Sequence, residues 1–197
     1  MATLDELRQQ FRAIEADAST LLDLSPWLLG VHASPGSWSA SECIEHLLFS
    51  INPYFRVWER ELAHAVPGNT TGRCKLDFWG HVLLWALEPP PKFRFRTPQA
   101  FDPKYIADTQ LERIILEPDQ TVEMFLASQR AVLKLLDDAE GIALDRIKIV
   151  SPFSRHVRYS VWSSLCVTAA HERRHLWQAR QAISIFSARF QNEAASD

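Results

Sequence analysis

Residues 39–62, SASECIEHLLFSINPYFRVWEREL, have the sequence pattern of a long amphipathic helix. Ser39 and Glu42 form a capping box, in which each side chain can bond to the backbone N–H of the other residue. Trp38, directly before this cap, is placed to act as a hydrophobic staple. Pro53 lies within the helix and predicts a kink rather than an end. Apolar residues recur every three or four positions and predict one buried face, made of Cys43, Leu47, Ile51, Tyr54, Trp58 and Leu62.

Three other segments repeat this apolar spacing. The first opens with a capping box at Thr3 and ends at Pro26, because the residue before a proline disfavours helix. Another begins near Pro118, since proline suits the first helical position, and stops at Gly141. The last runs from about residue 157 to residue 190. The four helices together predict an all-α fold, a four-helix bundle.

The connection between the second and third helices is unusually long for a compact domain. Residues 65–116 lack sustained periodicity, although residues 76–88 could form a short helix. The proline run at 89–91 forbids helix, and KFRFRTP (92–98) has an extended pattern. In a helical bundle such a segment is a crossover. We expect residues 1–197 to form one domain of this kind, since their number fits a single domain.

Charge and composition exclude several classes of protein. The net charge of -3 and the pI of about 6.2 give no electrostatic reason to bind nucleic acid, and the short FRFR run (93–96) does not change this. No apolar stretch reaches the roughly 18 residues of a membrane span, and the N-terminus lacks the apolar core of a signal peptide. Three cysteines without close spacing are typical of reduced thiols. We therefore expect a cytoplasmic protein that binds neither nucleic acid nor membrane.

His171 and His175 lie four residues apart in the last predicted helix. At 3.6 residues per turn they are separated by about 40° around the axis and about 6 Å along it, so both imidazoles can point at one ion. Such a pair also occurs by chance, either exposed or packed in a core. On a helical wheel both flank the apolar stripe, beside Thr168 and Gln178. His46 has the same relation to its own stripe, so adjacent helices could bring three imidazoles together.

Three neutral imidazoles can hold a divalent metal ion and leave one coordination position open for water or substrate. Near this site, Glu42 is a candidate base or a hydrogen-bond partner that orients His46, although the capping box explains it at least as well. Arg174 and Gln178 are candidates for substrate binding, but the wheel turns Arg174 away from the polar strip, and both are equally explained as solvated boundary residues. The remaining histidines have no partners at ligand spacing and are interpreted as ordinary surface or loop residues: His32, His64, His81 and His156.

Two motifs of this chain resemble elements of the DinB-like superfamily, also called DinB/YfiT-like. Trp38–Leu47, WSASECIEHL, is similar to its W-[ST]-x-x-E-x-x-x-H-[LI] element, and His171–Gln178, HERRHLWQ, to its H-x-x-R-H-x-x-Q element. The order and separation of the two motifs match as well. The resemblance implies a four-helix bundle with a long crossover, often dimeric, and a three-histidine site for nickel or zinc. The ligands correspond here to His46, His171 and His175.

The resemblance also bears on function. Members with assigned chemistry include transferases and isomerases that use low-molecular-weight thiols, and many others are labelled metal-dependent hydrolases. It therefore implies an enzyme that acts on a small-molecule substrate, either by hydrolysis or by thiol-dependent transfer. The alternative is a non-catalytic metal or small-ligand binding module of the stress-response type. A ferritin-like di-iron protein fits poorly, because that site needs Glu-x-x-His pairs with bridging carboxylates.

Overall fold

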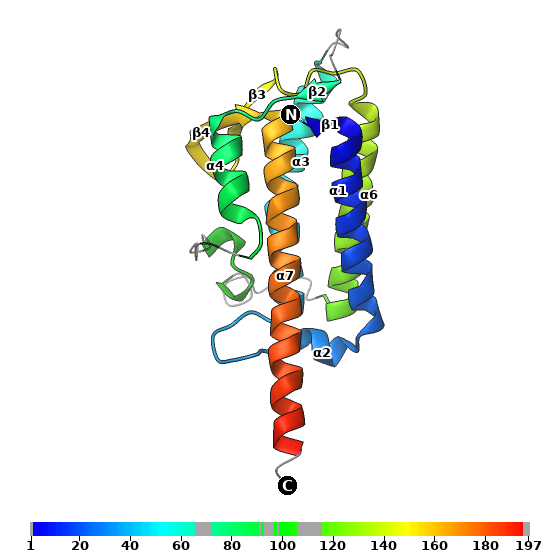
Figure 1. The fold of residues 1–197 in the computed structure, drawn as a ribbon, viewed down its shortest axis with the longest axis vertical. Coiled ribbons are helices and arrows are strands. Elements are labelled where there is room, and N and C mark those ends of the chain that lie inside the picture. Colours follow the sequence, from blue (N-terminus) through cyan, green and yellow to red (C-terminus); the bar gives the residue numbers. More distant parts are fainter. Residues whose placement is uncertain are drawn as a thin grey trace.

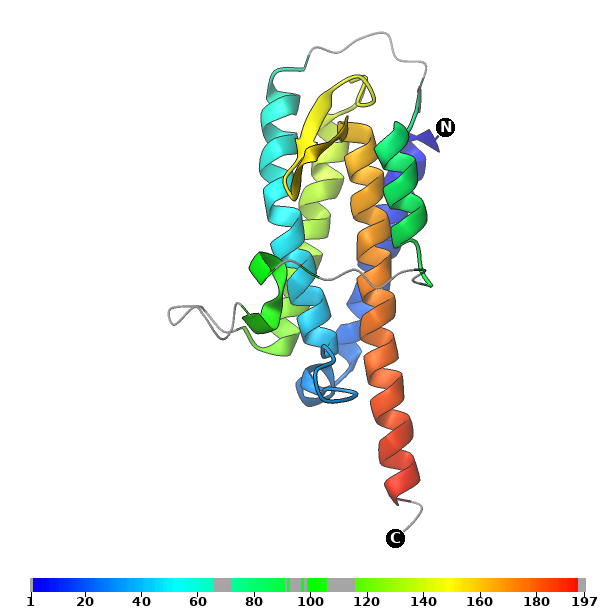
Figure 2. The same cartoon turned by 90° about the vertical axis from the view of Figure 1, so that its left-hand side faces the viewer.

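The computed structural model describes residues 2–65, 72–90, 92, 97, 99–105 and 116–194. Four long helices form the body of the molecule: α1 (Leu4–Ser19), α3 (Ala40–Ala63), α6 (Pro118–Asp138) and α7 (Val161–Ala194). Both α1 and α3 contact α6 and α7, so the four helices close around one core (Figure 1, Figure 2). The predicted all-α fold is confirmed. Among the described helices, α7 included, none has the apolar length of a membrane span.

Three of the four long helices, α1, α3 and α6, begin where the sequence predicts them. Thr3 caps α1 and Ser39 caps α3, each with the reciprocal side-chain and backbone bonds of a capping box. α6 begins with Pro118 in its first position. α3 continues through Pro53 to Ala63, so the proline does not end the helix. As a result, His46, Ser50 and Tyr54 all lie on one helix.

The start of the last helix differs from the prediction. α7 begins at Val161 rather than near residue 157, because Ser154–Ser160 form strand β4, which pairs antiparallel with β3 (Lys148–Ser151). Ile149 and Tyr159 face each other in this hairpin, and both are buried. Strand pairing rather than helical periodicity therefore determines how these residues are buried.

The end of the first helix also differs from the prediction. α1 ends at Ser19, and the 3-10 helix η1 (Thr20–Asp23) follows it. Pro26, which was expected to mark only an end, is the first residue of the short helix α2 (Pro26–Gly30). The same residue does both, because proline disfavours helix before it and suits the first position of a new one.

The chain between α3 and α6 is described in part. The helix α4 (Phe78–Leu87) confirms the short helix predicted within residues 76–88, and the 3-10 helix η2 (Gln99–Phe101) follows. Before α4, the strand β2 (Arg73–Cys74) pairs with β1 (Ala2–Thr3). The FRFR run and most of the stretch expected to be extended lie outside the described residues, and the course of this connection as a crossover stays a prediction.

Both ends of α4 are fixed to neighbouring elements. At its start, the Asp77 carboxylate accepts a hydrogen bond of 2.6 Å from the backbone N–H of Ser160 in β4. At its end, Arg173 of α7 donates two hydrogen bonds of 2.8 Å to the carboxylate of Glu88. α4 is therefore held against α7 and the hairpin, where it can form the wall of a cavity.

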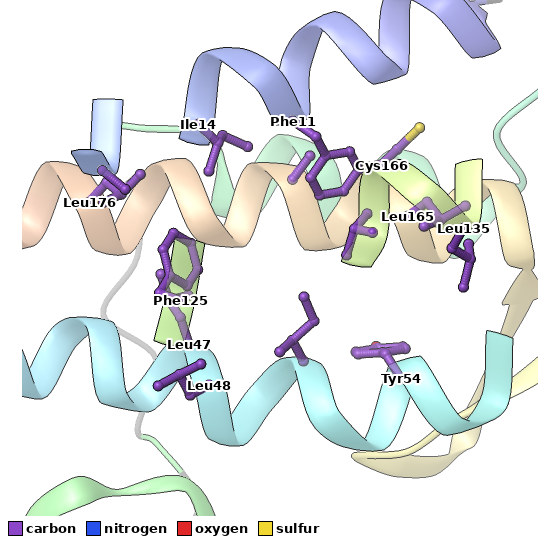
Figure 3. Close-up of a cluster of buried hydrophobic side chains, with 14 of the residues drawn as sticks. Phe11, Ile14, Leu47, Leu48, Tyr54, Phe125, Leu135, Leu165, Cys166 and Leu176 are labelled. Atoms are coloured by element: carbon purple, nitrogen blue, oxygen red, sulfur yellow. The ribbon is translucent and has the colours of Figure 1, made fainter. Parts of the chain in front are cut away.

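The core is filled by side chains from all four long helices. Figure 3 shows Phe11 of α1, Leu47 of α3, Phe125 of α6 and Leu165 of α7 in one cluster, and none of them is more than 1% exposed. Cys166 lies in the same cluster, and burial raises the pKa of its thiol to about 12. This cysteine therefore packs as a small hydrophobic side chain and is not an activated nucleophile.

Candidate metal site

Three histidine side chains from two helices converge at one point of the bundle. His46 comes from α3, and His171 and His175 come from α7, which packs directly against α3. One ring nitrogen of each histidine lies within 4.8 Å of the other two, and the Nε2 atoms of His46 and His171 are 3.3 Å apart. Two nitrogens bound tetrahedrally to zinc at about 2.0–2.1 Å are separated by roughly 3.3–3.4 Å. The cluster therefore fits a site for one metal ion.

Burial keeps the three imidazoles neutral. It lowers the pKa of His46 and lowers the pKa of His175 well below the ordinary value. Burial also lowers the pKa of His171 to about 3, and the nearby His46 and Arg174 act in the same direction. A neutral imidazole presents a nitrogen lone pair, which is the form that binds a metal ion. The protonation state of the cluster therefore also fits a divalent metal ion.

A backbone carbonyl orients His46. Its Nδ1 lies 2.6 Å from the carbonyl oxygen of Phe101 in η2. Because a carbonyl oxygen only accepts, Nδ1 carries the proton and Nε2 presents its lone pair to the other two histidines. A bond of this kind fixes the tautomer and the ring orientation of a metal ligand. Sequence reasoning missed Phe101, because a backbone carbonyl leaves no signal in a side-chain pattern.

Trp38 covers one side of the cluster. The centroid of its indole lies 5.1 Å from the ring of His46 and 5.9 Å from that of His175. The side chain is partly buried against the core. The position before the α3 cap, which predicted a hydrophobic staple, thus also places an aromatic ring beside two ligands.

A cavity of about 550 Å³ opens beside the three histidines. Small-molecule sites commonly have volumes of roughly 300–1,000 Å³. Polar side chains from α3 and α7 also line the cavity, among them Ser50, Arg174 and Gln178. The other walls are mostly apolar and come from α3, α4, α7, η2 and the hairpin; they include Leu47, Ile51, Leu83, Phe101, Phe153 and Val167.

Both residues predicted to bind substrate line this cavity. Arg174 is 9% exposed, and its Nη1 donates a hydrogen bond of 3.3 Å to the carbonyl oxygen of Ala86 in α4. Burial lowers the pKa of this guanidinium. The helical wheel was wrong to turn Arg174 away from the site, because the wheel takes no account of the docking of α4 over this side of α7. Gln178 lies one turn further along α7 and also lines the cavity.

Glu42 does not line the cavity. Its Oε2 accepts a hydrogen bond of 2.8 Å from the Ser39 backbone N–H, and the same oxygen lies 3.0 Å from Nε2 of His32. The capping interpretation of Glu42 is confirmed, whereas its role as a base stays a prediction. The histidines predicted to be ordinary surface residues are exposed, as expected: His32, His64, His81 and His156.

Sequence reasoning missed one buried acid beside the ligands. Glu172 is 1% exposed, and the Nε2 of Gln129 in α6 donates a hydrogen bond of 3.0 Å to its Oε1. Burial raises the pKa of the Glu172 carboxyl to about 8. On the wheel, Glu172 lies about 100° from His171, near the centre of the apolar stripe. An acidic residue at the centre of an apolar stripe is rare unless it is paired, and that signal could have found it.

The sequence as a whole matches a known protein family. No curated protein and no solved structure matches the chain. The sequence profile of the DinB superfamily matches residues 3–179, a span that includes the three histidines, Trp38 and the cap of α3. Because the match covers most of the chain, including all of α3 and the part of α7 that carries His171 and His175, the protein belongs to the DinB superfamily.

Proposed function

We propose that this protein is an enzyme that uses one divalent metal ion, zinc or nickel, held by His46, His171 and His175. The observation that carries the proposal is the position of the three nitrogens at the wall of a cavity. Among the described residues, no fourth His, Cys, Asp or Glu joins the cluster. Structural zinc sites usually have four protein ligands, whereas catalytic sites have three and an open position. The incomplete ligand set therefore favours catalysis.

The cavity indicates a small substrate with a largely apolar body. It extends along α3 from His46 to Tyr54, eight residues or about 12 Å on a helix. Its walls between these two residues are mostly apolar. We propose that Arg174 and Gln178 bind a polar or anionic group of the substrate, because both line the cavity within three residues of His175 on α7. Trp38 and the apolar walls exclude water from the reacting centre.

The site fits two classes of reaction. A bound divalent ion supplies Lewis acidity, which can activate water for hydrolysis or stabilise a thiolate for transfer to an electrophile. We propose one of these two activities, with a low-molecular-weight thiol as the second substrate in the transfer reaction. Both need the open position, and both need neutral imidazoles, which burial provides.

One set of assays tests this proposal. The protein is purified without a histidine tag, its zinc and nickel contents are measured, and electrophiles, esters and amides are assayed with and without a panel of thiols. A metal-dependent rate that requires thiol supports transfer, and a thiol-independent rate on esters or amides supports hydrolysis. A loaded protein with a fourth protein ligand and no solvent on the metal would instead be a binding module.

We also propose a homodimer. Phe78 is 72% exposed and Trp85 is 56% exposed, and both lie on α4, which also carries the partly exposed Trp79 and Val82. An exposed apolar patch of this kind commonly marks a surface that another protein covers. Sedimentation analysis of the purified protein tests this, and a monomer at micromolar concentration contradicts it.

A further inference from the structure

A group of buried polar atoms next to the histidines has no hydrogen-bond partner in the described part of the chain. The group comprises Oε1 of Gln129, Oγ1 of Thr168, Oε2 of Glu172 and Nδ1 of His175. All four side chains are at most 7% exposed. Buried polar groups in folded proteins are nearly always paired, so four unpaired atoms in one region need an explanation.

Three of the four residues lie on one face of α7. Thr168, Glu172 and His175 are at positions i, i+4 and i+7, which on an α-helix fall within about 60° of one another. All three line the cavity. Gln129 reaches this face from α6, where its amide N–H is bound to Oε1 of Glu172. One carboxylate oxygen is therefore held, and the other is buried on the face that carries His175.

The unpaired atoms are chemically complementary. When an imidazole binds a metal ion through Nε2, its Nδ1 carries a proton and becomes a donor. The outer nitrogen of a metal-binding histidine almost always donates to a carboxylate, a backbone carbonyl or water. His46 has such a partner in the Phe101 carbonyl. Among the described residues, none bonds to the buried Nδ1 of His175, and none donates to the buried Oε2 of Glu172.

We propose that Glu172 is the positioning residue for His175, resting on the proposed metal site. When His175 binds the metal ion through Nε2, its Nδ1–H donates to the Glu172 carboxylate, directly or across one water molecule. Gln129 holds the carboxylate in place from α6, and the Thr168 hydroxyl donates to the same network. Glu42 cannot take this role, because its carboxylate is bound to the cap of α3 and to His32.

A purely structural link between α6 and α7 is the competing explanation for the Gln129–Glu172 pair. Glu172→Gln separates the two explanations. The glutamine oxygen still accepts from Gln129, so the link and the shape remain, but an NH₂ donor now faces the donor Nδ1–H of His175. We expect zinc affinity, measured by competition with a chelator, to fall about 10- to 100-fold, the usual effect of losing such a partner. The melting temperature of the metal-free variant should not fall below that of the parent, whereas loss of a structural link would lower it.

The matched control is Glu42→Gln, the same change one turn before the ligand on α3, for which we expect parental zinc affinity. A parent protein that binds neither zinc nor nickel would overturn the metal site itself. A parent that binds one zinc, with Glu172→Gln binding it equally tightly, would leave the metal site intact and overturn the role of Glu172.

A second measurement does not depend on the folding of Glu172→Gln. In the NMR spectrum of the zinc-loaded parent, the Nδ1–H proton of His175 should be visible and slow to exchange with solvent. In Gln129→Leu, which removes the support of the carboxylate, the same proton should exchange faster. An Nδ1–H of His175 that exchanges rapidly in the parent would overturn the proposal.

Discussion

The two helices that carry the metal ligands support them in different ways. On α3, His46 is oriented by the backbone carbonyl of Phe101 at 2.6 Å. On α7, no described residue bonds to the buried Nδ1 of His175, and the proposed support is the side chain of Glu172, which Gln129 holds. Substitution of Phe101 leaves its backbone carbonyl in place, whereas substitution of Glu172 removes the carboxylate. The metal site should therefore tolerate substitution on the α3 side and be sensitive to it on the α7 side.

The largest effect should come from removing a ligand on either side. We expect His46→Ala, His171→Ala and His175→Ala each to lose stoichiometric zinc, because two imidazoles bind a divalent ion far more weakly than three. Each variant should remain folded, since the hydrophobic core is made of other residues. Metal analysis and circular dichroism measure the two outcomes. Full zinc occupancy in any two of the three variants would contradict the site.

Acid should weaken the metal-free fold, and the histidines on both α3 and α7 contribute to the loss. The pKa of His171 is about 3 in the folded protein and near the ordinary 6.5 in the unfolded chain. Between pH 6.5 and pH 3 the unfolded state binds more protons than the folded state. The contribution of neutral His171 to the free energy of unfolding is therefore fully present above pH 6.5 and is lost as the pH falls toward 3. The lowered pKa values of His46 and His175 act with the same sign.

Glu172 has the opposite effect on stability, in a pH range that partly overlaps that of the histidines. Burial raises its pKa from 4.5 to about 8, so its contribution is complete below about pH 4.5 and is lost as the pH rises through 8. Glu172→Gln removes this opposing contribution. Urea unfolding of the metal-free proteins at pH 5 and pH 7 should therefore show a steeper loss of stability on acidification in the variant. The difference is at most about 1.4 kcal/mol per pH unit for one proton. Identical pH dependence in parent and variant would contradict the buried, protonated state of Glu172.

A smaller effect is expected from Phe101→Ala on the α3 side. The substitution removes a ring that lines the cavity and packs 4.7 Å from the ring of Phe153, but it keeps the carbonyl that bonds His46. Zinc affinity should therefore change much less than in Glu172→Gln, while the KM for an apolar substrate rises. Chelator competition and steady-state kinetics measure the two quantities. A loss of zinc affinity as large as that of Glu172→Gln would break the contrast between the two sides.

The same contrast explains what the sequence could predict. The caps at Thr3 and Ser39 and the start of α6 at Pro118 depend on neighbours within four residues, so local patterns located them. The convergence of the three histidines followed from their shared position on the flanks of two apolar stripes. The β3–β4 hairpin was missed, because Val157 continues the helical spacing of α7 and the strand pairing that overrides it is not local.

The support of His175 was visible in the sequence only as two separate anomalies. Glu172 interrupts the apolar stripe of α7, and Gln129 lies within the apolar face of α6. Neither residue shows its partner until the two helices are packed together, since 43 positions separate them. Arg174 is a similar case, because its buried position depends on α4 docking over α7. Packing between helices, rather than propensity within them, therefore determines the surroundings of the ligands.

The smallest effect should come from Glu42→Gln, although Glu42 stands one turn before a ligand. Glutamine can form the same capping box, so α3 should keep its start, and only the partly exposed contact with His32 is weakened. Because the Glu42 carboxylate is bound to the Ser39 N–H and does not line the cavity, we expect kcat and zinc affinity near those of the parent. A general base at this position would instead cost about 10²-fold or more in kcat. Steady-state kinetics of the metal-loaded variant separate these outcomes. A loss of that size with unchanged zinc content would show that Glu42 leaves its cap during turnover and would reverse the assignment of the functional carboxylate to α7.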